Sequence, residues 1–151
     1  MIDEQKIETL DFEGKYLTFN LMDEFYGVSV DWILQIIAIP DITKIPKTPP
    51  FVKGVINLRG NVTPIIDLRC KLGFEQSDNT DQTRVIITKY ENIELGLIVD
   101  QTSDVIDVDL DLIEAVSSAG FNSDYFSGIA KIEGRLIILL KLSELINSKT
   151  D

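Results

Sequence analysis

The chain has 151 residues, 44% of them apolar, and a formal net charge of −11. This composition predicts one packed domain or two small lobes with a common core, and it disfavours nucleic acid or an anionic membrane as partner, because those surfaces require concentrated positive charge. The single Cys70 and the lack of any histidine exclude an internal disulfide, a thiolate metal cluster and a histidine base.

Nothing in the chain predicts secretion or membrane insertion. Apolar runs such as residues 136–140 are far shorter than the roughly 20 residues that a bilayer requires. Residues 1–13 are polar and acidic, unlike a signal peptide. We therefore expect a cytoplasmic protein with a loosely held tail at 1–13, a domain over 14–148 and a short tail at 149–151.

The first elements read as a hairpin followed by an irregular crossing. Residues 16–21 alternate between apolar and polar, which predicts a half-buried strand, and residues 25–30 return after a turn at 23–24. Residues 32–39 are almost wholly apolar and fit either a buried strand or a short helix. Four prolines between residues 40 and 50 then favour irregular structure at the surface.

A second hairpin is expected at 55–58 and 62–67, with its tip at 59–61. Residues 67–72 are amphipathic and Gly73 follows, which predicts one or two helical turns with a glycine stop. The remaining elements are expected as a loop at 75–82, a hairpin at 84–89 and 93–99, a strand at 102–108, a loop with a helical turn at 111–119, a hairpin at 128–142 and a helical turn at 143–147.

The hairpin of residues 55–67 recurs later in the chain. Gly54 and Gly60 match Gly128 and Gly134 at a constant spacing of 74 residues without a gap. Three apolar positions keep the same register, namely Val62 with Leu136, Ile65 with Leu139 and Leu68 with Leu142. This repeat indicates one supersecondary unit used twice.

A second repeat supports the same conclusion. Residues 27–31 (GVSVD) resemble residues 96–100 (GLIVD), 69 positions apart. Nine or ten short strands at regular spacing predict an all-β protein, and the duplication predicts two similar lobes. Closing each lobe into a small barrel would protect the strand edges.

The acidic run around residues 104–114 does not meet the requirements of a calcium loop. Asp107, Asp109 and Asp111 have the spacing of ligands, but Leu112 stands where the loop requires glycine and Ser118 where it requires glutamate. Alternation of aspartate with apolar residues is typical of a strand with one solvated face.

No motif predicts catalysis or a cofactor. The chain has no glycine-rich phosphate loop and no nucleophile elbow. Cys70 lies between Arg69 and Lys71, but without an imidazole base it reads as a small apolar residue. We expect a protein without metal, cofactor or enzymatic activity.

The two copies of the hairpin differ in their polar insert. The first has Asn57, Leu58 and Arg59 where the second has residues 131–133 (KIE). Arginine offers a rigid fork of donors and is favoured at protein interfaces. From composition alone Arg59 fits either an interface residue or an ordinary solvated arginine of a turn.

Several short segments occur in an order that is typical of one family. They are residues 16–19 (YLTF), 26–28 (YGV), 42–46 (ITKIP), 49–60 (PPFVKGVINLRG), 64–69 (PIIDLR), 96–100 (GLIVD) and Val105. In these segments, and over about residues 14–148, the chain resembles the CheW family of coupling proteins in bacterial chemotaxis.

The resemblance implies two intertwined five-stranded barrels of SH3-like type. It also implies a non-enzymatic adaptor at receptor arrays on the inner face of the membrane. The implied partners are the cytoplasmic tip of chemoreceptors, the regulatory domain of the histidine kinase CheA and other CheW copies in ring contacts.

The resemblance also implies partner-binding residues in three regions. They are the turn and the glycine before it (Gly54, Asn57, Arg59, Gly60), a segment facing the kinase or a ring neighbour (Ile33, Gln35, Ile37) and the receptor groove (Gly96, Val99, Asp100). Gln35 and Ile37 replace a Glu and an Arg that are common in the family, which indicates a divergent paralogue or a more apolar edge.

Three alternatives stay open on the sequence. A paralogue could serve a kinase pathway other than chemotaxis. A carboxylate-based enzyme would need two converging acids with raised pKa values. A barrel that binds oligonucleotides would need a basic groove, which the net charge disfavours.

Overall fold

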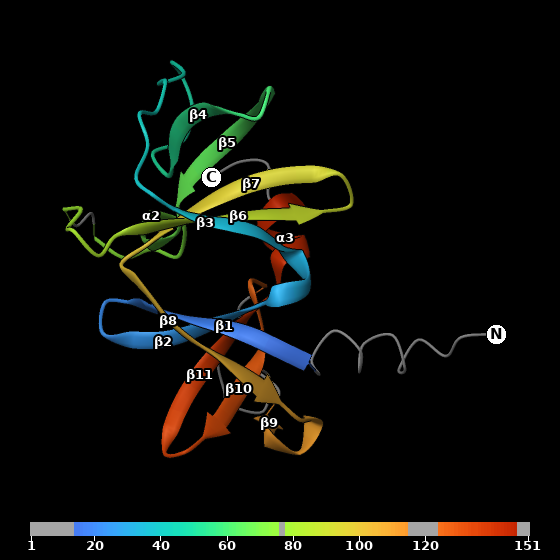
Figure 1. Cartoon of the computed structure of the whole chain (residues 1–151). Coiled ribbons are helices and arrows are strands. Elements are labelled where there is room, and N and C mark those ends of the chain that lie inside the picture. The colour runs from blue at the N-terminus through green and yellow to red at the C-terminus, as the bar shows by residue number, and fades with distance from the viewer. Residues whose placement is uncertain (1–13, 76–77, 115–123, 148–151) are drawn as a thin grey trace.

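The computed structural model describes residues 14–75, 78–114 and 124–147, and these form two sheets (Figure 1). The first sheet has the strand order β8 (Gln101–Val108), β1 (Gly14–Leu21), β2 (Glu24–Ser29), β11 (Arg135–Leu140), β10 (Phe126–Ile132) and β9 (Ile113–Glu114). The second has the order β3 (Ile33–Ala38), β6 (Arg84–Tyr90), β7 (Ile93–Val99), β5 (Asn61–Asp67) and β4 (Val52–Leu58). The helical elements are η1 (Val30–Trp32), α2 (Leu68–Lys71), η2 (Leu110–Leu112) and α3 (Leu142–Asn147).

The chain passes between the two sheets, so neither lobe is a continuous segment. β1 and β2 begin the six-stranded lobe, β3 to β7 make the whole five-stranded lobe, and β8 to β11 return to the first (Figure 1). α3 then packs back against β6 of the five-stranded lobe. The prediction of an all-β fold with two intertwined lobes is confirmed, and one sheet has the expected five strands whereas the other has six, because the two-residue β9 is added at its edge. The tails expected at 1–13 and 149–151 lie outside the described residues.

Both sequence repeats are repeats of structure. β5 runs parallel to β7 with Ile65 opposite Gly96, and β11 runs parallel to β2 with Leu139 opposite Gly27. These four residues are the pairs found 74 and 69 positions apart in the sequence. The repeated glycines therefore occupy equivalent places in the two sheets.

The repeated hairpin turns have the same backbone. Arg59 and Gly60 have φ values of 51° and 86°, and Glu133 and Gly134 have 51° and 78°. Positive φ at both central residues defines a two-residue type I′ turn, which matches the right-handed twist of the flanking strands. The tip was expected to include Asn61, but Asn61 already pairs with Leu58 in the ladder.

The apolar segment at 32–39 forms an edge strand. Its first residue ends η1, and β3 then runs from Ile33 to Ala38 with side chains alternating between half-buried and exposed. β-Branched isoleucines favour this pleated, half-covered setting over a helix.

The described residues contain eleven strands, more than the nine or ten expected. The addition is β9, whose two residues pair with Ile129 and Ala130 of β10. In the five-stranded lobe the corresponding pairing is a single bridge between Thr43 and Val55. The proline-rich crossing is thus fastened to β4 at one point. The part of the loop expected at 115–119 lies outside the described residues.

A core shared by the two sheets joins the lobes. Phe19 and Val28 from the six-stranded sheet lie in one buried cluster with Ile86 and Leu97 from the five-stranded sheet and Leu145 from α3. Two smaller clusters fill the individual lobes, namely Tyr16, Val108, Ala130, Ile137 and Leu139 in one and Ile56, Ile65, Val85, Ile87 and Ile98 in the other. Because full burial of such a side chain contributes about 1.5–3 kcal/mol, we expect the lobes to unfold together.

A hydrogen-bonded pair fixes an irregularity between β1 and β8. The register shifts between Leu17 and Phe19, and the buried Thr18 lies at this point. The Thr18 hydroxyl donates to a carboxylate oxygen of Asp104 at 2.6 Å and accepts from the Asp104 N–H at 3.0 Å. The hydrogen bond from Thr18 lowers the pKa of Asp104, burial opposes this, and the charge of Arg135 adds to the lowering.

Replacing Thr18 with Val should raise the pKa of Asp104 toward its ordinary value. Because the folded pKa lies below the unfolded one, the stability from this carboxylate is present above about pH 4 and is lost as the pH falls through the folded pKa. NMR titration of the Asp104 carboxyl in both proteins measures the effect. Equal midpoints would show that the hydroxyl does not set the pKa.

No helix within the described ranges is long and apolar enough to cross a membrane. In the same part of the chain, no group of three or more acidic or sulfur side chains could hold a metal ion.

Candidate interaction surfaces

The turn between β4 and β5 presents Arg59 to solvent. The side chain of Asn57 accepts a hydrogen bond from the Gly60 N–H at 3.0 Å and so closes the turn from within. Arg59 is exposed, and its guanidinium makes no hydrogen bond or ion pair with the rest of the described chain. Asn57 and Gly60 therefore shape the turn, and Arg59 is the side chain available to a partner.

Gly54 and Gly96 are packing positions. A Cβ on Gly54 would overlap the carbonyl oxygen of Thr43, and its φ of 140° is rarely adopted by other residues. A Cβ on Gly96 would overlap the side chain of Ile65. Val99 is fully buried. These three predicted site residues hold the strands in place and offer no side chain to a partner.

The predicted residues of β3 lie on its inner side. Ile33, Gln35 and Ile37 are half-buried, whereas Leu34 and Ile36 alternate with them and are 42% and 41% exposed. β3 pairs only with β6 and forms an edge of its sheet. The period-two pattern of a strand could have identified Leu34 and Ile36, had the segment not also fitted a helix.

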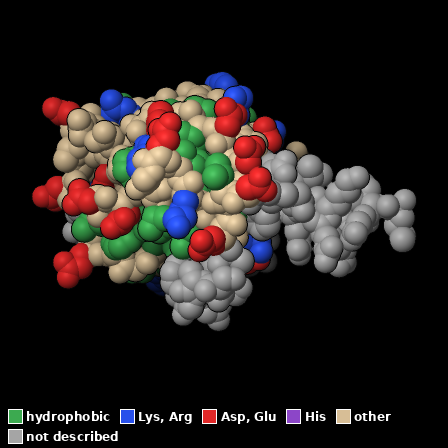
Figure 2. Space-filling model, turned by 90° about the horizontal axis from the view of Figure 1, so that it is seen from below, with side chains coloured by type: hydrophobic (Ala, Val, Ile, Leu, Met, Phe, Trp, Pro, Cys, Tyr) green, Lys and Arg blue, Asp and Glu red, His purple; other side chains and the backbone are tan. Residues whose placement is uncertain are grey.

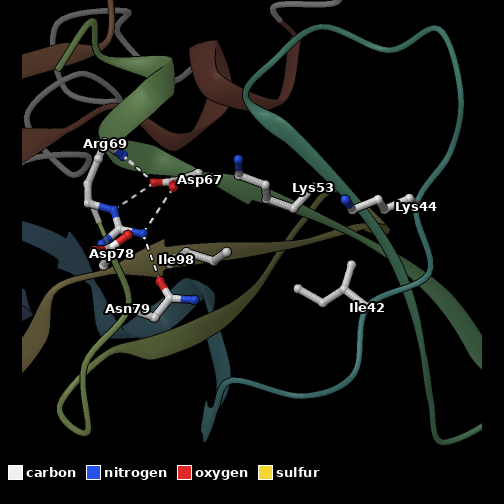
Figure 3. Close-up of a pocket in the computed structure, with 8 residues that line it drawn as sticks. All are labelled: Ile42, Lys44, Lys53, Asp67, Arg69, Asp78, Asn79 and Ile98. Carbon is white, nitrogen blue, oxygen red and sulfur yellow. Dashed lines mark hydrogen bonds and ion pairs between the residues drawn. The ribbon is translucent and has the colours of Figure 1, made fainter. Parts of the chain in front are cut away.

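Asp100 belongs to an ionic network centred on the buried Arg69, whose bonds to Asp67 and Asn79 are drawn in Figure 3. The Arg69 side chain is 2% exposed, and its guanidinium donates to both carboxylate oxygens of Asp67 at 2.9 and 3.0 Å. It also donates to Asp100 at 2.9 Å and to the side-chain oxygen of Asn79 at 3.0 Å. Burial alone would lower the pKa of Arg69, but the hydrogen bonds and charges of Asp67 and Asp100 outweigh it and raise that pKa.

The same aspartate joins the two lobes. Asp100 lies between β7 and β8, where the chain leaves the five-stranded sheet. Its second carboxylate oxygen accepts from the Met22 N–H at 2.8 Å, and its own N–H donates to the carbonyl of Asn20 at 3.1 Å. Arg69 in one lobe is thereby connected to the β1–β2 hairpin of the other. Neither residue's role could be inferred from the neighbouring sequence.

An apolar groove lies beside the β4–β5 hairpin. It has a volume of about 240 Å³ and is bordered by β4, β5, β7 and α3. Its lining residues are Phe51, Val52, Pro64, Ile66, Ile93, Glu94, Leu95, Leu145 and Ile146. Ile93 is 48% exposed, and Val62, at 73%, lies next to Glu94 in an adjoining hollow. The groove brings strand and helix residues together from distant parts of the chain.

The surface of the six-stranded lobe has apolar areas that are surrounded mainly by acidic side chains. Figure 2 shows this end of the molecule, with apolar side chains gathered near the middle and acidic side chains around the outline. Val105 and Leu136 of this lobe are 53% and 56% exposed. Such a surface suits a partner with apolar and basic side chains.

The predicted site residues thus divide among separate places. Asn57, Arg59 and Gly60 share the turn, the β3 residues lie at the opposite edge of the same sheet, and Asp100 lies at the junction of the lobes. The apolar groove and the exposed side chains of β3 are additions that sequence patterns did not identify.

Comparisons with known proteins agree on one family. The family model described as CheW-like domain matches residues 15–150. A chemotaxis protein CheW of Bacillus subtilis (strain 168) is 36% identical over 139 residues, which cover 90% of this chain and 88% of the relative. One of Thermotoga maritima is 33% identical and covers 91% of each. The crystal structure of the scaffolding protein TtCheW from Thermoanaerobacter tengcongensis superposes with a TM-score of 0.83 at 34% identity, covering 89% of this chain and 93% of that chain.

Proposed function

Because the chain belongs to the CheW-like family of chemotaxis scaffold proteins, we propose that it is a non-enzymatic adaptor that couples the cytoplasmic tips of chemoreceptors to the regulatory domain of the histidine kinase CheA. Its place of action would be the receptor array at the inner face of the membrane. Further contacts between copies of the chain would extend the array.

The observation that carries this proposal is the difference between two equivalent turns. Both have the same backbone, and one presents Arg59 where the other presents Glu133. Glutamate at the equivalent position shows that a turn of this shape does not require arginine. Arg59 is therefore available for a role other than forming the turn. An exposed guanidinium without a partner in the described chain is suited to a carboxylate or an aromatic face on another protein.

The apolar groove supports a helical partner. A receptor tip is a helical hairpin, and an amphipathic helix binds by laying its apolar face into such a groove. Ile93 is exposed at the groove and Val62 in the hollow beside it, and both would lose contact with water on binding. We assign the receptor to this groove and to the turn beside it.

The edge of β3 supports a second contact. Leu34 and Ile36 point outward from an edge strand that carries no charged residue. Charges on an edge strand normally prevent pairing with another chain, and their lack leaves this edge open to one. We assign it to the kinase or to a second copy.

The carboxylate-based enzyme finds no support among the described carboxyl groups. A general acid requires a raised pKa, whereas the pKa of Asp104 is lowered. Asp67 is held at both oxygens by Arg69.

Grafting the second turn onto the first tests the adaptor function. The triple variant Asn57→Lys, Leu58→Ile and Arg59→Glu should lower the free energy of unfolding by no more than about 1 kcal/mol, because only the Asn57 hydrogen bond is lost. Its co-sedimentation with chemoreceptor membranes and CheA should weaken at least about tenfold, which corresponds to roughly 1.4 kcal/mol.

The reciprocal graft is the matched control. Lys131→Asn, Ile132→Leu and Glu133→Arg changes the equivalent turn of the other lobe and should leave co-sedimentation unchanged. An unfolded first graft would show that the turn is structural, and undiminished co-sedimentation would remove the proposed role of Arg59.

Replacing Val62 with Asp should weaken binding of a receptor tip fragment at least about tenfold, because a charge would enter the apolar contact. The stability should change by less than about 0.5 kcal/mol, since Val62 is 73% exposed. Calorimetric titration measures the first and urea denaturation the second. Leu136→Asp is the control at the equivalent position of the other lobe, and equal losses in both variants would contradict the assignment of the groove.

A further inference from the structure

A second cavity lies in the five-stranded lobe, between the proline-rich crossing and the Arg69 network (Figure 3). Its volume is about 290 Å³. Lys44 comes from the crossing, Lys53 from β4 and Asn79 from the loop before β6. Figure 3 shows both lysine side chains extending toward the side of the cavity where Asp67 and Arg69 lie. We call this space the lysine cavity.

The lining of the lysine cavity includes two ammonium groups, those of Lys44 and Lys53, that form no ion pair with a described carboxylate. Neither ammonium group has an ion pair within 4.0 Å in the described chain, although the protein as a whole carries a net charge of −11. Asp67 lines the same cavity, but both its oxygens accept from Arg69. Asp78 is the remaining acidic group of the lining, which contains two lysines.

Asn79 adds a neutral donor. Its side-chain oxygen accepts from Arg69 at 3.0 Å, which fixes the amide so that its NH₂ group points away from the guanidinium. In Figure 3 this nitrogen faces the side of Ile42, and it makes no bond to any other described residue. Two ammonium groups and an amide donor line one cavity, and Ile42 and Ile98 form its apolar wall.

We propose that the lysine cavity binds a small molecule that carries a phosphate or carboxylate group. Lysine ammonium groups are compact charges that bind such oxyanions, and charge-assisted hydrogen bonds are about twice as strong as neutral ones. The isoleucine wall would contact the apolar part of the ligand. The proposal does not depend on the adaptor function, because the cavity is separate from the Arg59 turn, the apolar groove and the edge of β3.

Titration followed by amide NMR tests the proposal, with inorganic phosphate and succinate as separate probes and sodium chloride at matched ionic strength as reference. Phosphate or succinate should produce saturable shifts at Lys53, Asn79 and Ile98. In the double variant Lys44→Gln and Lys53→Gln the apparent affinity for the probe should fall at least tenfold. The other amide signals should keep the positions they have in the unaltered folded protein.

The double variant Lys131→Gln and Lys141→Gln in the other lobe removes the same charge and should bind like the unaltered protein. Saturation by phosphate alone would identify a phosphate-bearing ligand, and saturation by succinate a carboxylate-bearing one. Shifts that chloride reproduces, that neither probe saturates, or that persist without Lys44 and Lys53 would overturn the proposal.

Discussion

Replacing Arg69 with Ala should lower the free energy of unfolding by about 3–5 kcal/mol, the largest loss we expect from any exchange of a charged side chain. The substitution would leave the Asp67 carboxylate, 3% exposed, without its two guanidinium hydrogen bonds. It would also remove the donor that holds Asp100 and Asn79. An unpaired buried charge costs far more than the pair contributes, so the effect comes mainly from the aspartate left behind. Urea denaturation followed by tryptophan fluorescence measures it.

Arg135→Ala provides the control for this loss. Arg135 pairs with Asp104 at 3.5 Å, but the Asp104 side chain is 55% exposed, so the change should cost no more than about 1 kcal/mol. Because the pKa of Arg69 is raised above its already high ordinary value, the guanidinium stays charged through neutral pH, and its contribution should be lost only in strong alkali. A loss below 1 kcal/mol for Arg69→Ala would show that water reaches Asp67 and replaces the guanidinium.

The Arg69 network also shows which contacts cannot be predicted from sequence patterns. Asp67 and Arg69 stand at a helical turn that the sequence predicts, and Asp67 caps that turn by accepting from the Arg69 N–H. Their other partners, Asn79 and Asp100, are 10 and 31 residues further along from Arg69. Such contacts depend on how a loop and a neighbouring strand pack, and no local period encodes them.

The repeat, in contrast, could be inferred in detail. Glycine at the second position of a type I′ turn, and glycine where another strand comes close, are local requirements that appear in the sequence. Because both lobes have them, Gly27 and Gly96 or Gly60 and Gly134 could be matched before their positions were known. The apolar groove escaped the same reasoning, since α3 reaches it only through the crossing of the chain between lobes.

Replacing Gly54 with Ala should cost about 3 kcal/mol or more, as the sum of backbone strain and overpacking. The new methyl group would overlap a backbone carbonyl, which cannot turn away as a side chain can. Relief would require breaking the paired hydrogen bonds between Thr43 and Val55, both 2.9 Å long. Thermal and urea unfolding measure the loss.

The second copy supplies a graded series of controls. At Gly128 the added methyl group would lie 2.9 Å from the carbonyl oxygen of Glu114, but no positive φ adds strain, so the loss should be smaller. At Gly134 nothing lies within 4 Å, and only its φ of 78° disfavours alanine, at a cost of about 1 kcal/mol. The expected order of losses is therefore Gly54, Gly128 and Gly134.

The same variants distinguish two roles for Gly54, namely positioning the Arg59 turn and contacting the partner directly. If Gly54 positions the Arg59 turn, weaker partner binding by Gly54→Ala should accompany its loss of stability, and a stabilising solute should restore both together. If Gly54 touches the partner directly, binding should fall while stability stays near that of the unaltered protein. Its burial and its contact with Thr43 favour the first outcome. Arg59→Ala should show the opposite behaviour, with binding reduced and stability retained, because its side chain contacts no other described residue through a hydrogen bond or an ion pair.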